Sequence, residues 1–517
     1  MYNNHVKNDV RINVIVNLIR TLVLTLLSFI TFPWVCRYLG DSALGTYTWA
    51  NTFVGYFLIL AKIGLPNLAV RECVKVRDNK EVFSNKVQSF FLLQLITTVL
   101  SFGLMCFFVF FIAELKNNNA IIFLLAINFL SGVFSFEWVF IALEKQFYMS
   151  VRNIVILAVS AAFIIIFVTN PDDIYIYALI TVSGTIITSI INIIMLKGHV
   201  SFKKNMPYSY KEYIKPLCIL CALSLIVSLY NQIDTSSLGF IDTSKEQVAS
   251  YSVGTKGVDI IIGIITSLST VFIPRAAYYY QKEDKKYFNN LTKYSFNICL
   301  FIVMPAIVTM CVLSKEICGL ISGNYNFNDQ TSSYYNAPYV LMTLSSMMVT
   351  YSIGDIIFNQ ILLPMKKEKY YLIAMFIGTI INIGFALFFG NVIFKNTTLG
   401  PAFGVAIGTA FTDVLLIVFL LIITRKWIKK AIFNFNNLKL LFANIIIAIV
   451  SIIIYKPLYN LWDVLKIYSP LTLVLEILAI LFIDGIIYIV FLLLVKEDLV
   501  YSFIRKKNVE IEEQKNG

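Results

Sequence analysis

The feature that most constrains this chain is a repeated pattern of apolar stretches, each about as long as a membrane is thick. A membrane-spanning helix needs about 20 mostly apolar residues, and such segments recur along nearly the whole sequence, separated by short charged loops. Hydrophobic residues make up 58% of the chain and charged residues 14%, whereas soluble domains have about 25% charged residues. The sequence therefore predicts an all-α integral membrane protein.

The apolar stretches predict about fourteen transmembrane helices. The expected spans are 10–35, 44–62, 87–113, 119–143, 150–169, 174–196, 214–238, 248–273, 294–314, 338–362, 370–391, 400–424, 438–458 and 470–495. The first stretch is too long for the core of a signal peptide and lacks a cleavage site of small residues. We therefore expect it to remain in the protein as the first span.

The distribution of basic residues predicts the orientation of these helices. Lys and Arg favour cytoplasmic loops, and of the 42 Lys and Arg residues only seven fall in the alternate loops that begin after the first span. These seven are Arg37, Lys116, Lys245, Lys315, Lys395, Lys456 and Lys466. We therefore expect both termini to be cytoplasmic. The basic residues form no patch interleaved with aromatic side chains, which argues against nucleic acid as a partner.

An internal repeat suggests two similar halves. Tyr47 and Tyr251 are separated by the same interval as Arg71 and Arg275. That interval covers an even number of spans, so the two halves should point the same way, as in transporters built from parallel repeats. The expected organisation is a six-helix lobe at 1–200, a second six-helix lobe at 201–432, and two appended helices with a cytoplasmic tail at 433–517.

Cationic and amide side chains within the spans are the first candidates for function. A charge at mid-bilayer costs about 2.5–3.5 kcal/mol on insertion scales and usually faces a bundle interior or a wet cavity. Helical spacing puts Asn17 and Arg20 on one face of the first span and Asn51 and Lys62 on one face of the second. With Lys256 in the eighth span, these helices would offer cations to one cavity. The alternatives are interhelical ion pairs for Arg20 and Lys256, and an extended side chain reaching the interface for Lys62.

Acidic residues at membrane depth are expected to balance these cations, bind a coupling ion or carry protons. Asp259 follows Lys256 by three residues, and Asp355 shares a helix face with Asn359. The other acids within spans are Glu137, Asp234, Asp413, Glu476 and Asp484. Both histidines, His5 and His199, lie in predicted cytoplasmic segments, so any proton coupling would depend on carboxylates.

No pattern typical of an enzyme is found in the sequence. It has no phosphate-binding glycine loop, no His-centred triad and no metal-ligand cluster, so we expect no catalytic residue, no metal and no cofactor. The longest predicted outer segment, 315–337, is polar and rich in Tyr and Asn but holds few acids or bases. The sequence therefore favours a transport protein over an enzyme.

Two further patterns favour helix packing over chemistry. Cys218 and Cys221 have the spacing of a redox or metal motif, but they lie in a predicted membrane helix with no histidine nearby. Gly400, Gly404 and Gly408 repeat every four residues in one span, a pattern typical of close helix contacts.

Several short motifs occur in a characteristic order along the chain. They are Phe32-Pro33, Arg37-Tyr38-Leu39-Gly40, Leu44-Gly45-Thr46-Tyr47, Arg71-Glu72, Glu137-Trp138 with Glu144 and Arg152, Asp234 with Leu238-Gly239, Pro274-Arg275, and Leu363-Pro364 with Lys366 and Glu368. Together they resemble the polysaccharide flippase family, the O-antigen and capsule repeat-unit transporters of the multidrug, oligosaccharidyl-lipid and polysaccharide exporter superfamily. One departure is Val248-Ala249-Ser250-Tyr251, where Val-Gly-Tyr-Tyr is usual.

The resemblance implies a V-shaped, MATE-like pair of six-helix lobes with a central cavity and alternating access in the bacterial cytoplasmic membrane. It implies a substrate of oligosaccharide on undecaprenyl pyrophosphate, moved to the outer leaflet for capsule, O-antigen or exopolysaccharide synthesis, and coupling to an ion gradient. Membrane lipids, a polysaccharide polymerase and a chain-length regulator are the other partners it suggests. Because a pyrophosphate needs cations in a dehydrated site, we expect Arg20, Lys62 and Lys256 to bind it.

Three alternatives are open at this stage. A multidrug efflux transporter of the same superfamily would need a mainly acidic or aromatic cavity without buried Lys and Arg. A membrane polysaccharide polymerase or glycosyltransferase would need a substantial outer loop or an acidic metal-binding motif, and the sequence shows neither. A purely structural membrane protein would have little reason to keep charges at membrane depth.

Overall fold

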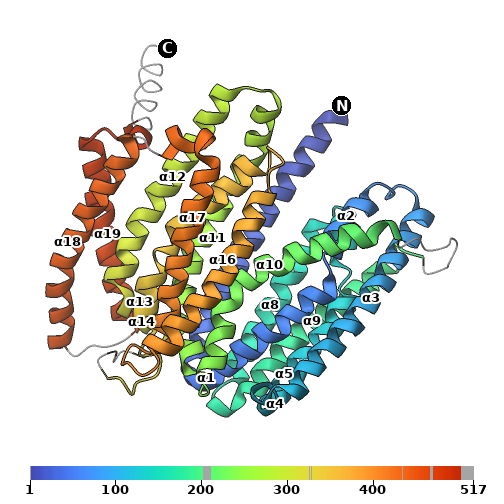
Figure 1. Ribbon diagram of the computed structural model, residues 1–517, viewed down its shortest axis with the longest axis horizontal. Helices are drawn as coiled ribbons and strands as arrows, with labels where there is room; N and C mark the ends of the chain where they lie inside the picture. The colour runs from blue at the N-terminus through green and yellow to red at the C-terminus, as the bar shows by residue number, and fades with distance from the viewer. Residues whose placement is uncertain are drawn as a thin grey trace. The chain divides into compact units, whose positions relative to one another are not determined.

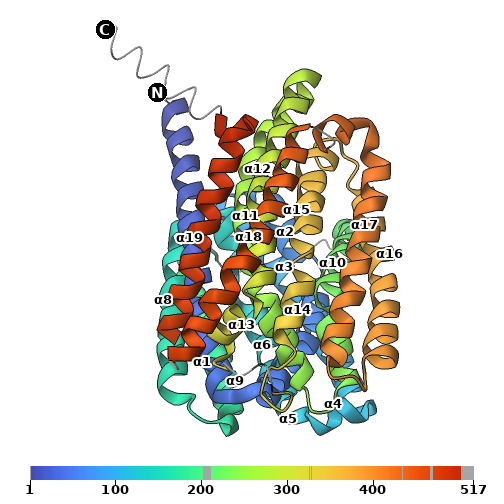
Figure 2. The ribbon, with the colours of Figure 1, turned by 90° about the vertical axis from the view of Figure 1, so that its left-hand side faces the viewer.

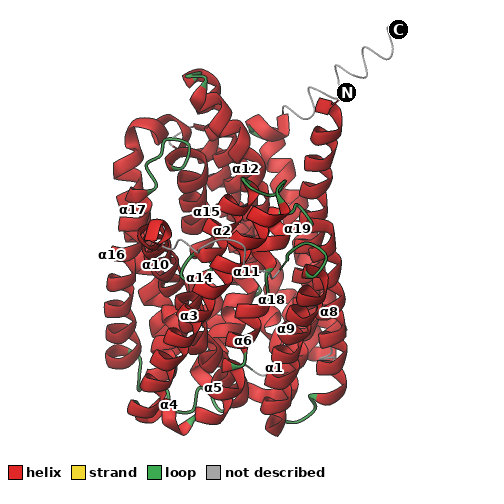
Figure 3. Ribbon diagram, turned by 90° about the vertical axis from the view of Figure 1, so that its right-hand side faces the viewer, coloured by secondary structure: helices red, strands yellow, loops and turns green. Residues whose placement is uncertain are grey.

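The computed structural model describes residues 2–201, 211–324, 327, 329–432, 435–465 and 470–501. Within these ranges the regular structure consists of helices and contains no strand (Figures 1 and 3). Thirteen helical segments of the described chain are long and apolar enough to cross a membrane. The predicted all-α, multi-pass membrane fold is therefore confirmed.

Thirteen segments are counted where fourteen spans were predicted, because the helices of the first two predicted spans follow each other directly across a kink and together form α1. Helix α1 runs over Tyr2–Lys62 and changes direction at Gly40, whose φ of 73° and ψ of 178° are not helical. This positive φ is readily accessible to glycine and strained for other residues. The predicted spans 10–35 and 44–62 thus lie on the two sides of Gly40.

The described chain divides into two compact units, Met1–Ala249 and Ser250–Gly517. The boundary falls inside one continuous helix, α11 (Glu246–Gln281), so that α10 belongs to the first unit. The lobe boundaries at 200 and 432 predicted from the sequence stay a prediction, as does the orientation of the termini.

Unit 1 is built around the long helix α1. Its other helices are α2 (Leu65–Val74), α3 (Lys80–Phe111), α4 (Ala113–Asn117), α5 (Asn119–Ala126), α6 (Asn128–Phe134), α7 (Glu137–Ala142), α8 (Gln146–Phe167), the 3-10 turn η1 (Pro171–Asp173), α9 (Ile174–Leu196) and α10 (Lys211–Ile241). Helix α1 packs against α3, α8 and α10. Helix α3 begins after Asn79, whose side chain accepts hydrogen bonds from the first-turn N–H groups of Glu81 and Val82 at 3.1 and 3.2 Å, as expected for an N-cap residue.

The apolar core of unit 1 gathers large side chains from short and long helices together. Phe83 and Phe90 of α3 pack with Trp138 and Phe140 of α7 and with residues of α2. Gly64 precedes α2 with φ of 68°, and a side chain there would overlap Leu220 of α10. This glycine therefore allows α10 to lie close to the start of α2.

Unit 2 contains the remaining helices. They are α11, α12 (Lys285–Val312), α13 (Ser314–Ser322), α14 (Ala337–Leu344), α15 (Met347–Ile356), the π-helical η2 (Ile357–Leu362), α16 (Lys369–Phe385), the π-helical η3 (Ala386–Ile393), α17 (Gly400–Ile432), α18 (Phe435–Leu465) and α19 (Pro470–Leu494). Helix α13 covers the first part of segment 315–337, where the sequence had suggested only a polar loop. Its buried face includes Cys318 and Ile321, which explains why a polar segment is helical there.

Close packing in unit 2 depends on small residues. A methyl group on Gly404 of α17 would stand 2.6 Å from the Phe389 carbonyl oxygen of η3, and one on Gly408 would stand 3.0 Å from the backbone of Phe385. The packing role predicted for these glycines is therefore confirmed at both positions. Helices α18 and α19 lie side by side (Figures 1 and 2), and Tyr488 of α19 donates a hydrogen bond to the carbonyl of Phe301 in α12 at 3.0 Å.

Candidate functional site

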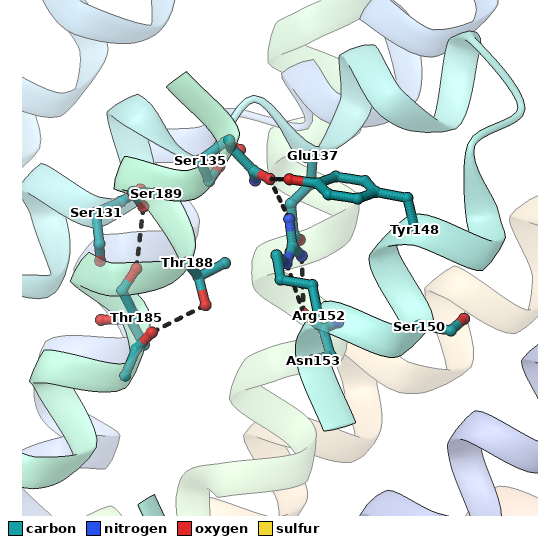
Figure 4. A network of polar contacts seen from close by, with 12 residues as sticks. Ser131, Ser135, Glu137, Tyr148, Ser150, Arg152, Asn153, Thr185, Thr188 and Ser189 are labelled. Atoms are coloured by element: carbon teal, nitrogen blue, oxygen red, sulfur yellow. Dashed lines mark hydrogen bonds and ion pairs between the residues drawn. The ribbon is translucent and has the colours of Figure 1, made fainter. Parts of the chain in front are cut away.

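A polar network of unit 1 surrounds Arg152 of α8 (Figure 4). Only 5% of Arg152 is exposed, and its guanidinium donates to Oε1 of Glu137 at 2.8 Å and to Oδ1 of Asn153 at 2.7 Å. The Tyr148 ring lies 5.6 Å from the guanidinium carbon. Glu137, a predicted charge-balancing residue, therefore pairs with Arg152, and its own side chain is half exposed.

Asn192 of α9 completes this network from the buried side. It is 0% exposed, its Oδ1 accepts from Arg152 and from the Tyr148 hydroxyl, the latter at 3.1 Å, and its amide donates to the Ser135 carbonyl. Ser135 lies in the break between α6 and α7. Asn192 thus ties α8, α9 and this break together, a role that no spacing pattern in the sequence indicated.

A second buried cation of unit 1 is Lys245, in the corner between α10 and α11. Only 2% of Lys245 is exposed. Its ammonium donates to the Glu114 carboxylate and to the carbonyls of Gly239 and Asp242, and it lies 4.4 Å from the centre of the Trp49 ring. The sequence analysis placed Lys245 in an outer loop but did not predict that it is buried. Loop length and charge do not reveal which loop residues are buried.

The predicted cationic face of unit 1 is described in part. Asn51 and Lys62 of α1 are exposed, whereas the side chains of Asn17 and Arg20, which belong to the same helix, lie outside the described residues. Asp234 of α10 is buried, and its charge interacts with Tyr56 of α1. Asn51 and Lys62 are therefore polar groups on the open surface of a membrane helix.

In unit 2, helix α11 carries a pair of opposite charges on adjacent turns. Lys256 is half-buried and Asp259 is exposed, and the charge of Lys256 acts on the Asp259 carboxylate. The same helix packs tightly against α14 at Gly254 and Gly257. Because glycine has no side chain, α11 can approach so closely there that a methyl group would overlap Val340 or Leu341. The packed glycines hold α11 against its neighbour, and the charged pair lies on the same turns of the helix, with Lys256 between the two glycines.

Asp355 of α15 lies near the start of the π-helical segment η2. Its Oδ1 accepts a hydrogen bond from Asn359 at 2.7 Å, which confirms the predicted shared face. Tyr351, one turn earlier, interacts electrostatically with both Asp355 and Asp259. Single π-helical turns occur often at functional sites, so α15 and η2 add a second reason to look for function here.

Asp413 of α17 extends the acidic group of unit 2. It is buried, and it accepts a hydrogen bond from the Thr350 hydroxyl at 3.3 Å. Tyr371 of α16 interacts electrostatically with both Asp355 and Asp413. Unit 2 thus gathers three predicted acidic residues, Asp259, Asp355 and Asp413, around two tyrosines, and it also contains the predicted cation Lys256. The other predicted residues belong to unit 1; they are Asn17, Arg20, Asn51, Lys62, Glu137 and Asp234.

Nothing in these polar groups indicates catalysis. Across the described residues, no group of three or more His, Cys, Asp and Glu side chains is placed to hold a metal ion. The arrangement consists of single charges and small polar clusters on long membrane helices, which can bind, release and balance charge.

Comparison with known proteins finds similarity to transport and polysaccharide biosynthesis proteins. The family model described as polysaccharide biosynthesis protein matches residues 10–280, and the MatE model matches residues 220–388. The putative O-antigen transporter of Escherichia coli K12 is 20% identical over 81% of this chain and 98% of its own length. The putative O-antigen transporter of Shigella dysenteriae is 23% identical over 77% of this chain and 95% of its own.

Solved structures share the fold at low sequence identity. The lipid II flippase MurJ in an inward closed conformation has a TM-score of 0.68 at 18% identity and covers 93% of this chain and 99% of its own. An inward-facing multidrug resistance MATE family transporter of the MOP superfamily has a TM-score of 0.57 at 14% identity, covering 81% and 99%. Because the polysaccharide model matches more than half of the sequence, this chain belongs to the polysaccharide biosynthesis protein family.

Proposed function

We propose that this protein is a flippase that moves lipid-linked oligosaccharides across the membrane. The match of the polysaccharide biosynthesis model to residues 10–280 carries the proposal. Similarity to two putative O-antigen transporters and to the fold of a lipid II flippase supports it. Those relatives are transporters, which move a substrate without altering its bonds, so we propose no catalytic residue.

The finer proposal concerns the substrate and the membrane. The substrate is an oligosaccharide repeat unit on undecaprenyl pyrophosphate, carried from the inner to the outer leaflet of a bacterial cytoplasmic membrane, with both termini in the cytoplasm. A polysaccharide polymerase and a chain-length regulator would act on the product after it reaches the outer leaflet. Alternating access supplies the movement, because one site must face each side of the membrane in turn.

We propose that basic side chains bind the pyrophosphate. Lys62 is exposed and Lys256 half-buried on membrane helices, where a charge is costly in lipid. An anionic ligand in a water-filled cavity would interact favourably with both cations. Arg20 is the third proposed cation, with Asn17 and Asn51 beside it on α1. Asp234, Glu137, Asp259, Asp355 and Asp413 are proposed to balance charge or respond to the coupling ion.

A multidrug efflux transporter is the second candidate, favoured by the match of the MatE model to residues 220–388. Organic cations would be attracted by the acidic group of Asp259, Asp355 and Asp413 in unit 2. Resistance to cationic drugs separates the two functions, since a flippase should leave drug resistance unchanged. A membrane polymerase is the enzyme alternative, and it predicts a different product in the experiment below.

The function is tested by deleting the gene and measuring lipid-linked sugar and surface polymer together. A flippase predicts that surface polysaccharide is lost and that the complete lipid-linked repeat unit accumulates on the cytoplasmic face. If the unit instead reaches the outer face and stays unpolymerised, the protein is a polymerase. If neither quantity changes and cationic drugs become more toxic, it is an efflux transporter.

We expect the substitution Lys256→Gln to lower transport roughly 10- to 100-fold at normal protein levels. A hydrogen bond to a charged group contributes about 1.5–3 kcal/mol, and each 1.4 kcal/mol corresponds to about tenfold in binding. The matched control is Lys282→Gln, because Lys282 follows the end of the same helix and is exposed. The measurement is the rate at which lipid-linked oligosaccharide reaches the outer leaflet. Equal rates for both variants would remove Lys256 from the site.

A further inference from the structure

Two glutamates are buried where α13 meets α19 in unit 2. Glu316 of α13 and Glu476 of α19 are each only 4% exposed. Helices α13 and α19 pack together, and Leu473 of α19 lies close to Gly319 on α13. The charges of the two carboxyl groups interact with each other. The contact therefore brings two like groups together in a place that water hardly reaches.

The hydrogen bonds of this pair are incomplete. The Tyr455 hydroxyl of α18 donates to Glu316 Oε1 at 2.6 Å. No described residue donates to Glu316 Oε2 or to Glu476 Oε1, although both atoms are buried. The charge of Lys315, the neighbour of Glu316 on α13, acts on Glu316. Each glutamate therefore lacks one hydrogen-bond partner, and a buried carboxylate oxygen without a donor is costly.

A single proton would supply what both glutamates lack. Two carboxylates that share a buried site cannot both ionise without strong repulsion, and such pairs retain a proton. We propose that Glu316 and Glu476 form a proton-binding pair that holds one proton in a hydrogen bond between them and so fastens α19 to α13. The proton makes one glutamate a donor and the other its acceptor, which removes the repulsion and satisfies the unpartnered oxygens.

A sodium ion has the same charge but fits this place less well. Hard cations bind through several oxygen ligands at once, whereas among the described residues no group of three or more His, Cys, Asp and Glu side chains is placed to hold a metal ion. Burial also raises the pKa of Glu316 above its ordinary value, against the opposing effect of the Tyr455 hydrogen bond. Both observations favour the proton.

The pair attaches the C-terminal helices, which neither family model covers. The polysaccharide model ends at residue 280 and the MatE model at residue 388, whereas Glu476 and Tyr455 come from α19 and α18. The proposal depends on the contact between α13 and α19 and is independent of the substrate proposed above.

The test is an infrared titration of the full-length protein in detergent, following the C=O band of protonated carboxyl groups against pH. In the wild type, we expect one carboxyl of the pair to keep its proton far above the pKa of about 4.3 of a free glutamate. In Glu316→Gln and in Glu476→Gln, the remaining carboxyl should lose its proton at a lower pH, because the neighbouring charge is gone and the amide can donate. Asp329→Asn is the control, since Asp329 is an exposed acid and its replacement should leave the band unchanged.

Thermal unfolding gives a second readout. A carboxyl whose pKa is raised on folding contributes stability below its unfolded pKa and loses it as the pH rises through the folded value. The melting temperature of the wild type should therefore fall with rising pH more steeply than that of either glutamine variant. Equal slopes, or an infrared band unaffected by both substitutions, would overturn the proposal.

Two further measurements keep the proposal open to refutation. If sodium raised the melting temperature of the wild type at fixed pH but not that of the variants, and no protonated band appeared, the occupant would be sodium. If the glutamine variants failed to fold, Tyr455→Phe would serve, because it removes the hydroxyl that donates to Glu316 and keeps both carboxyl groups. Without this hydroxyl, the C=O band of the protonated carboxyl should persist to a higher pH than in the wild type. A band with an unchanged pH dependence would contradict the shared proton.

Discussion

Replacing Gly45 with alanine is expected to lower the free energy of unfolding by at least about 1–3 kcal/mol, the usual cost of overpacking a well-packed interior. A methyl group on Gly45 would overlap the backbone carbonyl of Lys245. Lys245 cannot simply turn away, because its ammonium is held by Glu114 and by two carbonyls of its own corner. The substitution must therefore push the whole corner between α10 and α11 away from α1.

Gly103→Ala is the matched control for this prediction. Gly103 also lies in a membrane helix, but no atom stands within 4 Å of the position its methyl group would take. Alanine is favoured over glycine in a helix interior by about 1 kcal/mol, so this variant should be as stable as the wild type or more so. Thermal unfolding of the purified proteins in one detergent compares them. If Gly45→Ala unfolded at the same temperature as Gly103→Ala, the corner would be free to move.

The positions of the helices could be predicted from the sequence because lipid imposes a simple rule. A chain in a bilayer must satisfy its backbone within each span, so an apolar stretch such as 400–424 becomes one helix, found as α17 at Gly400–Ile432. The division between the first two spans was also predicted, since the expected spans 10–35 and 44–62 lie on the two sides of Gly40, where two helices meet at a kink. Apolar length alone did not show that no loop separates them.

Three glycines in the short motifs that carried the family resemblance allow a kink or a close contact between distant segments. Gly40 makes the bend in α1, Gly45 makes room for Lys245, and Gly239 would overlap the Trp49 ring if it carried a side chain. These glycines could be recognised as a pattern, but their reason could not be derived from sequence, because each depends on a segment far away in the chain.

The polar sites were predicted unevenly for a physical reason. Asp355 and Asn359 are neighbours on one helix, so spacing alone predicted the hydrogen bond between them. Glu316 and Glu476, by contrast, meet only because α13 packs against α19. Spacing within one helix cannot show such a contact, and Glu316 also lies in a segment whose polar composition concealed a helix.

Replacing Asn192 with leucine is expected to destabilise unit 1 more than replacing Glu137 with glutamine. Leucine leaves the Ser135 carbonyl, the Tyr148 hydroxyl and one guanidinium N–H of Arg152 without their present partner. Each buried group left unsatisfied costs about 1–3 kcal/mol, and Asn192 is fully buried, so water cannot take its place. Glutamine at position 137 keeps an oxygen for Arg152, and the half-exposed side chain can be hydrated, so its cost should stay within about 1 kcal/mol.

The two variants separate a buried amide network from an ion pair as the source of stability. Thermal unfolding and the yield of monodisperse protein in the same detergent measure the difference. If Glu137→Gln proved as damaging as Asn192→Leu, the ion pair of Arg152 would dominate and the amide would be secondary. The opposite order would show that the uncharged, fully buried Asn192 holds α8, α9 and the break before α7 together, with Glu137 left to adjust the charge on the exposed side of Arg152.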